Sequence, residues 1–469
     1  MFAPYRFLHC AGGAADCSQL SLKGIDMEKQ WSEMTWQEKR EERFKKWLST
    51  TGVKFGSPEA AKKYQVRANR MVKAIKMEIP DRVPVHIAGN SMVAYNAGFT
   101  LKDVLYDPDK IKIAWTKWLQ DYDQDSNDAP MFFSGKVYEI LDYKVNKWPG
   151  HGLPDTTTLQ NFVEKEYMQA DEYDLFMKDQ FDFGLRHFIP RTWGAFEPLA
   201  NIPSFSSYQG LPERLMAMCL DPTFQKLFKA IQAASKENAR YQKVMGACAH
   251  ESLEMGYPPL MGGMMLAPFD TVADMLRGTH GSVMDMYRQP EKLLEALEVI
   301  AQRSQESAVN MVNMARSPIV FVPMHKGDDS FMSVKQFEKF YWPTFRKLLL
   351  GCINEGCVPM MVIDGSYNEA RLKIISELPR TSVVWTMEKT DMFMAKKILG
   401  DAACISGNVT AAQLYTQTPP VIKEYCRKLI EVCSKGGGYI LSLGSGIDKC
   451  NPANLHAIIE AAEEYGYYK

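Results

Sequence analysis

The sequence lacks an excess of charge of either sign and has no segment long and apolar enough to cross a membrane. Lysine and arginine number 55 and aspartate and glutamate 56, which gives the 469 residues a formal net charge of -1. No basic field is present to hold nucleic acid, and no apolar run reaches the roughly 20 residues that a membrane-spanning helix needs. We therefore expect no nucleic acid and no membrane as a partner.

The cysteines show no paired spacing. Ten are scattered along the chain, and neither Cys352 with Cys357 nor Cys426 with Cys433 forms a CxxC motif. This pattern argues against a disulfide framework and favours a reducing compartment, so we expect a cytoplasmic protein. The first residues have too short an apolar run for a signal peptide, and a helix pattern that begins near Met27 suggests that translation starts there.

Several catalytic motifs are also missing. No GxGxxG or GxxxxGK[ST] follows a strand pattern, no GxSxG elbow is present, and no helix carries HExxH. The sequence therefore does not support nucleotide-phosphate binding, a serine hydrolase or a standard zinc site.

From residue 290 onward, apolar strand patterns alternate with helix patterns. The expected helices span 290–315, 333–355, 368–378, 390–399, 418–434 and 452–465, and the expected strands span 318–324, 358–363, 382–387, 402–407 and 438–444. Almost wholly apolar strands separated by helices predict a parallel sheet that is buried on both faces.

The first part of the chain reads differently. We expect helices over 27–50 and 57–77, a first strand over 82–89 and a mostly helical region over 100–260, with its clearest helix over 221–245. The predicted division is an N-terminal helical extension, 1–58, followed by a barrel domain, 59–469. Residues 27–77 are expected either to cover the bottom of the barrel or to form the contact of a homodimer.

Polar side chains follow nearly every expected strand, as in "IVFVPMHKGDD" (319–329). In a closed barrel all these strand ends open on one face, whereas an open sheet would gather them at one switch point. We therefore predict an α/β protein with a (β/α)8 TIM barrel and candidate site residues at the strand ends. These are His86, Asn90, His325, Lys326, Asp328, Asp329, Asp364, Tyr367, Glu388, Asp391, Asn408, Ser445 and Asp448.

Structural roles are open for several of these residues. Asp328, Asp329 and Asp391 precede helix patterns and are placed to cap them. His86 lies within an apolar strand, where a histidine is often a hydrogen-bonded core residue. A purely structural role is harder to assign to Asp364 and Glu388, because both follow apolar strands directly. A carboxylate buried there needs a partner, a proton or a metal.

The C-terminal part resembles the uroporphyrinogen decarboxylase superfamily, whose members are (β/α)8 barrels. The resemblance rests on "ISGNVTAAQLYTQTPPVIKEYCRKLIEVCSKGGGYILSLGSGIDKCNPANLHAIIEAAEEYG" (405–466), and on "APFDTVADMLRG" (267–278), "MYRQPEKLLEALE" (286–298) and "MSVKQFEKFYWPTF" (332–345). It covers roughly residues 60–469 and implies the fold more specifically than the reaction.

Two branches of that superfamily have signatures that this chain lacks. Its decarboxylases carry a glycine-flanked arginine pair after the first strand, but "HIAGNSMVAYNAG" (86–98) contains no arginine to bind substrate carboxylates. Its corrinoid-linked methyltransferases hold a thiol-activating zinc with His-x-Cys and a later cysteine. Val362, Asp364 and Ser445 stand at those positions, so that zinc site does not carry over.

The resemblance that remains is to members that serve methyl transfer with a pterin acceptor, as in O-demethylation. It implies a methyltransferase that works with a corrinoid carried on a partner protein and with a small acceptor such as tetrahydrofolate. His325 would then donate a proton, and carboxylates or amides would hold the pterin edge. The candidates for the second role are Asp328, Asp329, Asp364, Glu388 and Asn408.

Two readings compete with this one. We expect no metal, and the alternative is a metal site made by His325, Asp364 and Glu388. For the reaction, the alternatives are a uroporphyrinogen decarboxylase-type carboxy-lyase and a non-catalytic tetrapyrrole-binding member of the fold.

Overall fold

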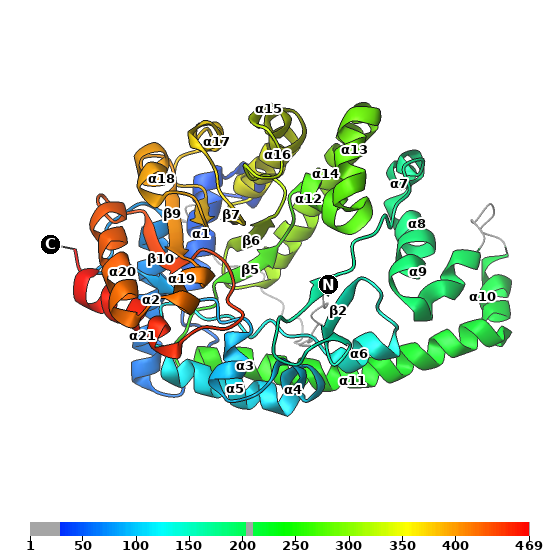
Figure 1. Ribbon diagram of the computed structural model, residues 1–469, viewed down its shortest axis with the longest axis horizontal. Coiled ribbons are helices and arrows are strands. Elements are labelled where there is room, and N and C mark those ends of the chain that lie inside the picture. The colour runs from blue at the N-terminus through cyan, green and yellow to red at the C-terminus, as the bar shows by residue number, and fades with distance from the viewer. Residues whose placement is uncertain (1–28, 203–209, 469) are drawn as a thin grey trace, which may run out of the picture.

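A parallel sheet of seven strands forms the centre of the computed structural model, which describes residues 29–202 and 210–468. The strands lie in the order β1-β10-β9-β8-β7-β6-β5, and the helices that follow them cover their outer side (Figure 1). The strands are β1 (Val85–His86), β5 (Met261–Met264), β6 (Ile319–Met324), β7 (Val358–Ile363), β8 (Val384–Met387), β9 (Cys404–Val409) and β10 (Tyr439–Leu443).

The polar segment 123–128 joins the two edge strands, β1 and β5. The Asp125 amide donates a hydrogen bond to the Val85 carbonyl at 2.9 Å, and the Asn127 amide donates to the Pro258 carbonyl, just ahead of β5, at 3.2 Å. Because the segment satisfies backbone groups at both edges, the ring of strands closes through it. The predicted barrel fold is confirmed, with an irregular segment in the place of one strand.

The helices that the sequence predicted after residue 290 lie where they were expected, and the helices at 268–270, 278–288 and 411–416 are additional. Asn368, Asp391, Thr410 and Asn451 each accept amides of the first turn of the helix that they precede, which fixes where these helices begin. The helices are α12 (Pro268–Asp270), α13 (Gly278–Arg288), α14 (Pro290–Met314), α15 (Val334–Gln336), α16 (Trp342–Asn354), α17 (Glu369–Ile375), α18 (Met392–Leu399), α19 (Ala411–Thr416), α20 (Pro419–Cys433) and α21 (Pro452–Tyr465).

Two N-terminal helices, α1 (Trp36–Leu48) and α2 (Pro58–Ile75), close the bottom of the barrel. Phe44, Trp47 and Met71 are buried in one cluster with side chains from the first residues of five strands. Those strand residues are Ile319, Val358, Val384, Cys404 and Ile440. These two helices therefore cover the barrel bottom, which was one of the two roles expected of residues 27–77. The expected start at Met27 lies outside the described residues, and the division after residue 58 stays a prediction.

The region between β1 and β5 forms a helical arm beside the barrel, with a three-stranded sheet that the sequence did not predict. In its longest helix, α11, the buried residues Leu227, Ala234, Tyr241 and Cys248 recur every seven positions and form one seam. The strands of the small sheet are β2 (Asn146–Pro149), β3 (Gly152–Leu153) and β4 (Asn161–Phe162). The helices are α3 (Met92–Asn96), α4 (Leu101–Tyr106), α5 (Pro108–Asp121), α6 (Gly135–Ile140), α7 (Tyr173–Lys178), α8 (Gln180–Phe183), α9 (Ile189–Thr192), α10 (Leu211–Leu220) and α11 (Pro222–Glu254).

In the part of the chain that the structure describes, no helix has both the length and the apolar character needed to cross a membrane.

Candidate active site

The upper half of the barrel interior is accessible. On β6 the side chains of Phe321 and Pro323 keep partial exposure, while their neighbours Val320 and Val322 are fully buried in the main core. Alternate residues of a strand point to opposite faces, so Phe321 and Pro323 face the barrel axis and His325 continues their row. The strand ends therefore surround a hollow at the C-terminal face, where (β/α)8 barrels hold their active sites.

His325 lies between two carboxylates from neighbouring elements. Its Nδ1 is 2.6 Å from Asp274 Oδ2, on the π-helical turn η4 (Thr271–Leu276), and its Nε2 is 3.7 Å from Asp364 Oδ2, directly after β7. Burial lowers the pKa of His325, but the hydrogen bond and charge of Asp274, with the charges of Asp270 and Asp364, outweigh burial and raise the pKa to about 9. At neutral pH His325 is an imidazolium that can donate a proton.

Asp270, the last residue of α12, is fully buried beside this histidine. Its carboxylate accepts the backbone amides of His325 and Lys326, each at 3.0 Å, and the Tyr341 hydroxyl at 2.8 Å. Burial raises the pKa of Asp270 to about 6, and the charge of Asp274 adds to the rise. Asp270 thus faces the protein interior, whereas Asp274 meets the imidazole.

Asp364 and Glu388 form an acidic wall at the ends of β7 and β8. Burial raises the pKa of Asp364, the charge of His325 opposes this rise, and the charge of Glu388 adds to it. Glu388 accepts the Gly365 amide at 2.9 Å and the Ser445 hydroxyl at 3.5 Å. The two strand ends therefore present carboxylate oxygens that can accept N–H groups of a ligand.

A cavity of about 290 Å³ opens beside His325 and Lys326. Lys326 Nζ donates to Thr279 Oγ1 at 3.0 Å and lies 3.6 Å from Asp274 Oδ1, so both cations of the cavity already have partners. Charged and apolar side chains share the lining, which suits a planar ring with hydrogen-bonding edges. The other lining residues are Val145, Phe162, Val163, Glu164 and Ala273.

Four of the expected site residues make hydrogen bonds that hold the protein itself together. Asp328 accepts the Ser330 hydroxyl at 2.7 Å and the Phe331 amide at 3.1 Å. Asp329 forms an ion pair with the buried Arg371 and accepts from Asn368, and Asp391 caps α18. Asn408 donates to the Thr390 carbonyl at 2.8 Å and accepts from Tyr425 at 2.7 Å. The structure places none of these four side chains beside His325.

The remaining expected residues lie around the hollow in separate environments. His86 Nδ1 is 2.9 Å from Ser126 Oγ, and burial lowers the pKa of His86 to about 4, so it is neutral. Asp448 accepts the Ser91 hydroxyl at 2.8 Å. Asn90 lies against Gly446, and Tyr367 is buried against Gly327. These residues border the strand ends without joining the carboxylates around His325.

Sequence reasoning missed three carboxylates, Asp128, Asp270 and Asp274. Asp270 and Asp274 are four residues apart in "APFDTVADMLRG", a spacing that puts two side chains on one face of a helix. That spacing was the available signal. Asp128 accepts the amides of Leu260 at 3.0 Å and Met261 at 2.9 Å, and burial raises its pKa to about 6. Asp128 lies within the polar segment 123–128, which has neither a helix nor a strand period, so no pattern identified it.

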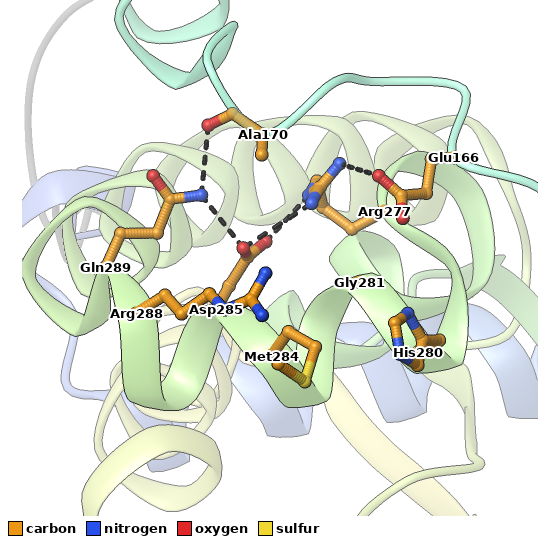
Figure 2. Close-up of a pocket in the computed structure, with 9 residues that line it drawn as sticks. All are labelled: Glu166, Ala170, Arg277, His280, Gly281, Met284, Asp285, Arg288 and Gln289. Carbon is orange, nitrogen blue, oxygen red and sulfur yellow. Dashed lines mark hydrogen bonds and ion pairs between the residues drawn. The ribbon is translucent and has the colours of Figure 1, made fainter.

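A second cavity, of about 270 Å³, lies along α13 (Figure 2). Its floor is the buried pair of Arg277 and Asp285, with Nε 2.7 Å from Oδ2. Glu166 extends the pair, since its Oε2 is 2.6 Å from Arg277 Nη1, and Gln289 donates to Asp285 at 2.8 Å. These contacts tie α13 to the segment that carries Glu166, next to the cavity of His325.

Among the described residues, no three or more His, Cys, Asp or Glu side chains are arranged to hold a metal ion. Within the alternative metal set, His325 and Asp364 are close, but Glu388 is engaged by the Gly365 amide. The expectation of a metal-free site stays a prediction.

Comparisons with known proteins agree on the fold family. A curated uroporphyrinogen decarboxylase from Methylococcus capsulatus is 33% identical over 82 residues, which cover 17% of this chain and only 22% of that protein. A solved methyltransferase from Methanosarcina mazei is similar in fold, with a TM-score of 0.55 and 15% identity over 85% of this chain and 98% of that one. A family model described as uroporphyrinogen decarboxylase (URO-D) matches residues 220–465, more than half of the sequence. The chain therefore belongs to the uroporphyrinogen decarboxylase family.

Proposed function

We propose that the protein is a methyltransferase that moves a methyl group between a corrinoid protein and a small acceptor such as tetrahydrofolate. The observation that carries this proposal is the charge of the site. Asp274 and Asp364 pair with the His325 imidazolium, and Asp274 also lies beside Lys326. Glu388 adds a third carboxylate, with Lys389 at 3.6 Å, so each of these cations already has a carboxylate partner. No arginine lines the described cavity beside His325. A substrate with several carboxylates finds few unpaired cations here, whereas a neutral ring with N–H donors finds acceptors.

The residues of the site have distinct roles in this proposal. His325, fixed through Nδ1 by Asp274, donates its Nε2 proton to the heteroatom when that atom loses its methyl group. In the opposite direction the heteroatom releases a proton as it gains the methyl group, and the neutral imidazole takes it up. Asp364 and Glu388 accept N–H groups at the edge of the heterocycle, as carboxylates do when they bind an amide-like edge. Val145, Phe162 and Val163 give the ring an apolar surface. Binding in the hollow excludes water from the transfer.

The corrinoid would reach this site on a partner protein and would supply or accept the methyl group when bound. Phe162 lines the cavity and is 60% exposed, so an aromatic side chain lies uncovered at the edge of the site. An exposed aromatic surface suits a flat macrocycle better than a charged surface does. The residues present therefore suit the group, and their task is to orient the acceptor and manage its proton.

The test is the absorbance change of methylcob(III)alamin, used as a free corrinoid, when protein and tetrahydrofolate are added together. We expect demethylation that needs both the protein and the acceptor, with methyltetrahydrofolate as product. Corrinoid loss without the acceptor, or no change with the acceptor at high concentration and with a co-purified corrinoid protein, would contradict the proposal.

A decarboxylase is the second candidate, because the curated relative with the 82-residue similarity is a uroporphyrinogen decarboxylase. The same protein preparation is incubated with uroporphyrinogen under reducing conditions, and released CO2 is measured. Turnover there, without methyl transfer, would assign the carboxy-lyase. Tight tetrapyrrole binding with neither activity would indicate a non-catalytic member.

A further inference from the structure

One buried side chain, that of Asp270, binds the backbone turn that carries His325. Asp270 accepts the amide of His325 through Oδ2 and the amide of Lys326 through Oδ1, both at 3.0 Å. Two adjacent backbone amides bound by one carboxylate fix the direction in which the chain leaves β6. The position of the His325 imidazole depends on that direction, because its side chain starts from this turn.

Asp270 is itself held in place by a tyrosine whose ring is packed against other aromatic residues. The Tyr341 hydroxyl donates to Asp270 Oδ2 at 2.8 Å, and the Tyr341 ring stacks on Phe337 with centroids 5.3 Å apart. The turn packs closely on the same ring: a Cβ added to Gly327 would lie 2.9 Å from Tyr341 Cζ and 2.7 Å from the Tyr367 hydroxyl. The carboxylate and the turn therefore share one rigid support.

We propose that Asp270 is a positioning residue, which sets the β6 turn so that the His325 imidazole meets Asp274 and points its free nitrogen at the substrate. This inference rests on the proposed function for the role of His325. The geometry of the imidazole can nevertheless be measured without turnover.

Other charged groups face His325 and must stay unchanged in the test. Asp274 comes from η4, Asp364 from the end of β7, Lys326 from the same turn, and Glu164 from the segment that lines the shared cavity. Of these, only Lys326 is hydrogen-bonded to Asp270, through its backbone amide. D270N leaves these side chains unchanged but removes the charge of Asp270, which helps to raise the pKa of His325, so a variant that keeps this charge is also needed.

The decisive variant is D270N, which keeps the shape of the side chain but replaces one acceptor oxygen by an NH2 group. One of the two amides then loses its acceptor and the turn must move. A misplacement of about 1 Å can cost about 100-fold in rate. We expect kcat to fall to about that extent while KM for the acceptor changes little, since Asp270 is buried away from the ligand cavity.

The matched control is D125N. Asp125 is also a fully buried carboxylate that accepts a backbone amide, from Val85 at 2.8 Å, but it pairs with Arg70 and Arg82. We expect D125N to lower thermal stability as D270N does and to leave kcat unchanged. Equal losses of kcat in the two variants would reduce Asp270 to a general structural role and overturn the proposal.

A readout without turnover is the downfield proton resonance of the imidazole N–H that donates to Asp274. H325Q identifies the resonance by removing it. We expect D270N to shift or broaden it and D125N to leave it in place, whether or not methyl transfer is the reaction. Y341F removes only the hydroxyl that holds Asp270 and keeps the charge of Asp270, so we expect a smaller shift in the same direction. An unmoved resonance in Y341F would overturn the proposal, whether or not D270N folds.

Discussion

The two ends of the barrel are built from the same strands and have opposite character. At the bottom, Ile319, Val358 and Val384 are fully buried against Phe44 and Trp47 of the N-terminal helix α1. At the top, the same strands β6–β8 end in His325, Asp364 and Glu388, and the first two of these side chains are 34% and 43% exposed. One end hides apolar surface, while the other keeps charged groups within reach of a ligand.

The difference indicates that the stability of the fold and the reactivity of the site depend on opposite ends of the barrel. Burying apolar surface at the bottom stabilises the fold without constraining the chemistry at the top. The carboxylates at the top gain little from burial, and the raised pKa values of Asp270 and Asp364 show that burial opposes their charged forms. We therefore expect substitutions at the top to change activity far more than stability, and substitutions at the bottom to do the reverse.

The largest expected effect is at the top. H325Q removes the proton donor and should lower kcat/KM about 1,000-fold, within the range for loss of a general acid. The exposed His280 is the control, and H280Q should keep full activity because it lies outside the cavity of His325. Thermal unfolding of the two variants should agree within a few degrees. Full activity in H325Q would mean that His325 serves only the local structure.

At the bottom, M71A should lower the free energy of unfolding by about 3 kcal/mol, since Met71 is fully buried in the cluster under the barrel. Denaturant unfolding measures this loss. The activity per folded molecule should remain that of the parent, because the cavity forms far from the strand ends. A large loss of kcat in fully folded M71A would show that the two ends are coupled.

The pH dependence of activity should depend only on groups at the top of the barrel. The pKa of His325 is raised to about 9, so the proton donor is present at neutral pH and is lost as the pH rises through that value. In the direction in which the methylated heterocycle gives its methyl group to the corrinoid, we expect kcat/KM to be level near pH 8 and to fall about tenfold per pH unit well above 9. H325Q should lack this limb, and a limb that persists in H325Q would assign it to another group.

The same raised pKa predicts a stability change of defined sign. His325 binds its proton more tightly in the folded than in the unfolded chain, so its stabilising contribution is complete below about pH 6.5 and is lost as the pH rises to 9. The melting temperature of H325Q should therefore depend less on pH across this window. An identical dependence in the parent and in H325Q would contradict the role of the Asp274 pair.

The smallest expected effect is at Asp391, a strand-end residue that the sequence predicted as part of the site. Asp391 follows β8 at the top of the barrel, yet it caps α18 by accepting the amides of Phe393 at 2.8 Å and Met394 at 3.0 Å. D391A should cost about 1 kcal/mol of stability, as loss of a helix cap does, and should leave kcat unchanged. A tenfold loss of kcat would place Asp391 in the site after all.

The sequence predicted the barrel because its strands β6–β10 are nearly uninterrupted apolar runs between helices. It did not predict the closing segment 123–128, since a polar stretch that pairs by its backbone carries no hydrophobic period. For the site, the position after a strand selected His325, Asp364 and Glu388, whose catalytic role stays a prediction. The same rule also selected Asp328, Asp329 and Asp391, because the first turn of a helix and an active site both follow strand ends in this fold.

By itself the sequence determined the alternation of strands and helices after residue 290, the end of the barrel at which charge collects and the absence of arginine in "HIAGNSMVAYNAG". Only the tertiary structure decided which carboxylates meet the histidine. Asp270 and Asp274 precede His325 by about 50 residues and reach it because α12 and η4 pack beside β6. Local patterns report on neighbours along the chain, whereas the proton on His325 is held by residues that are neighbours only after folding.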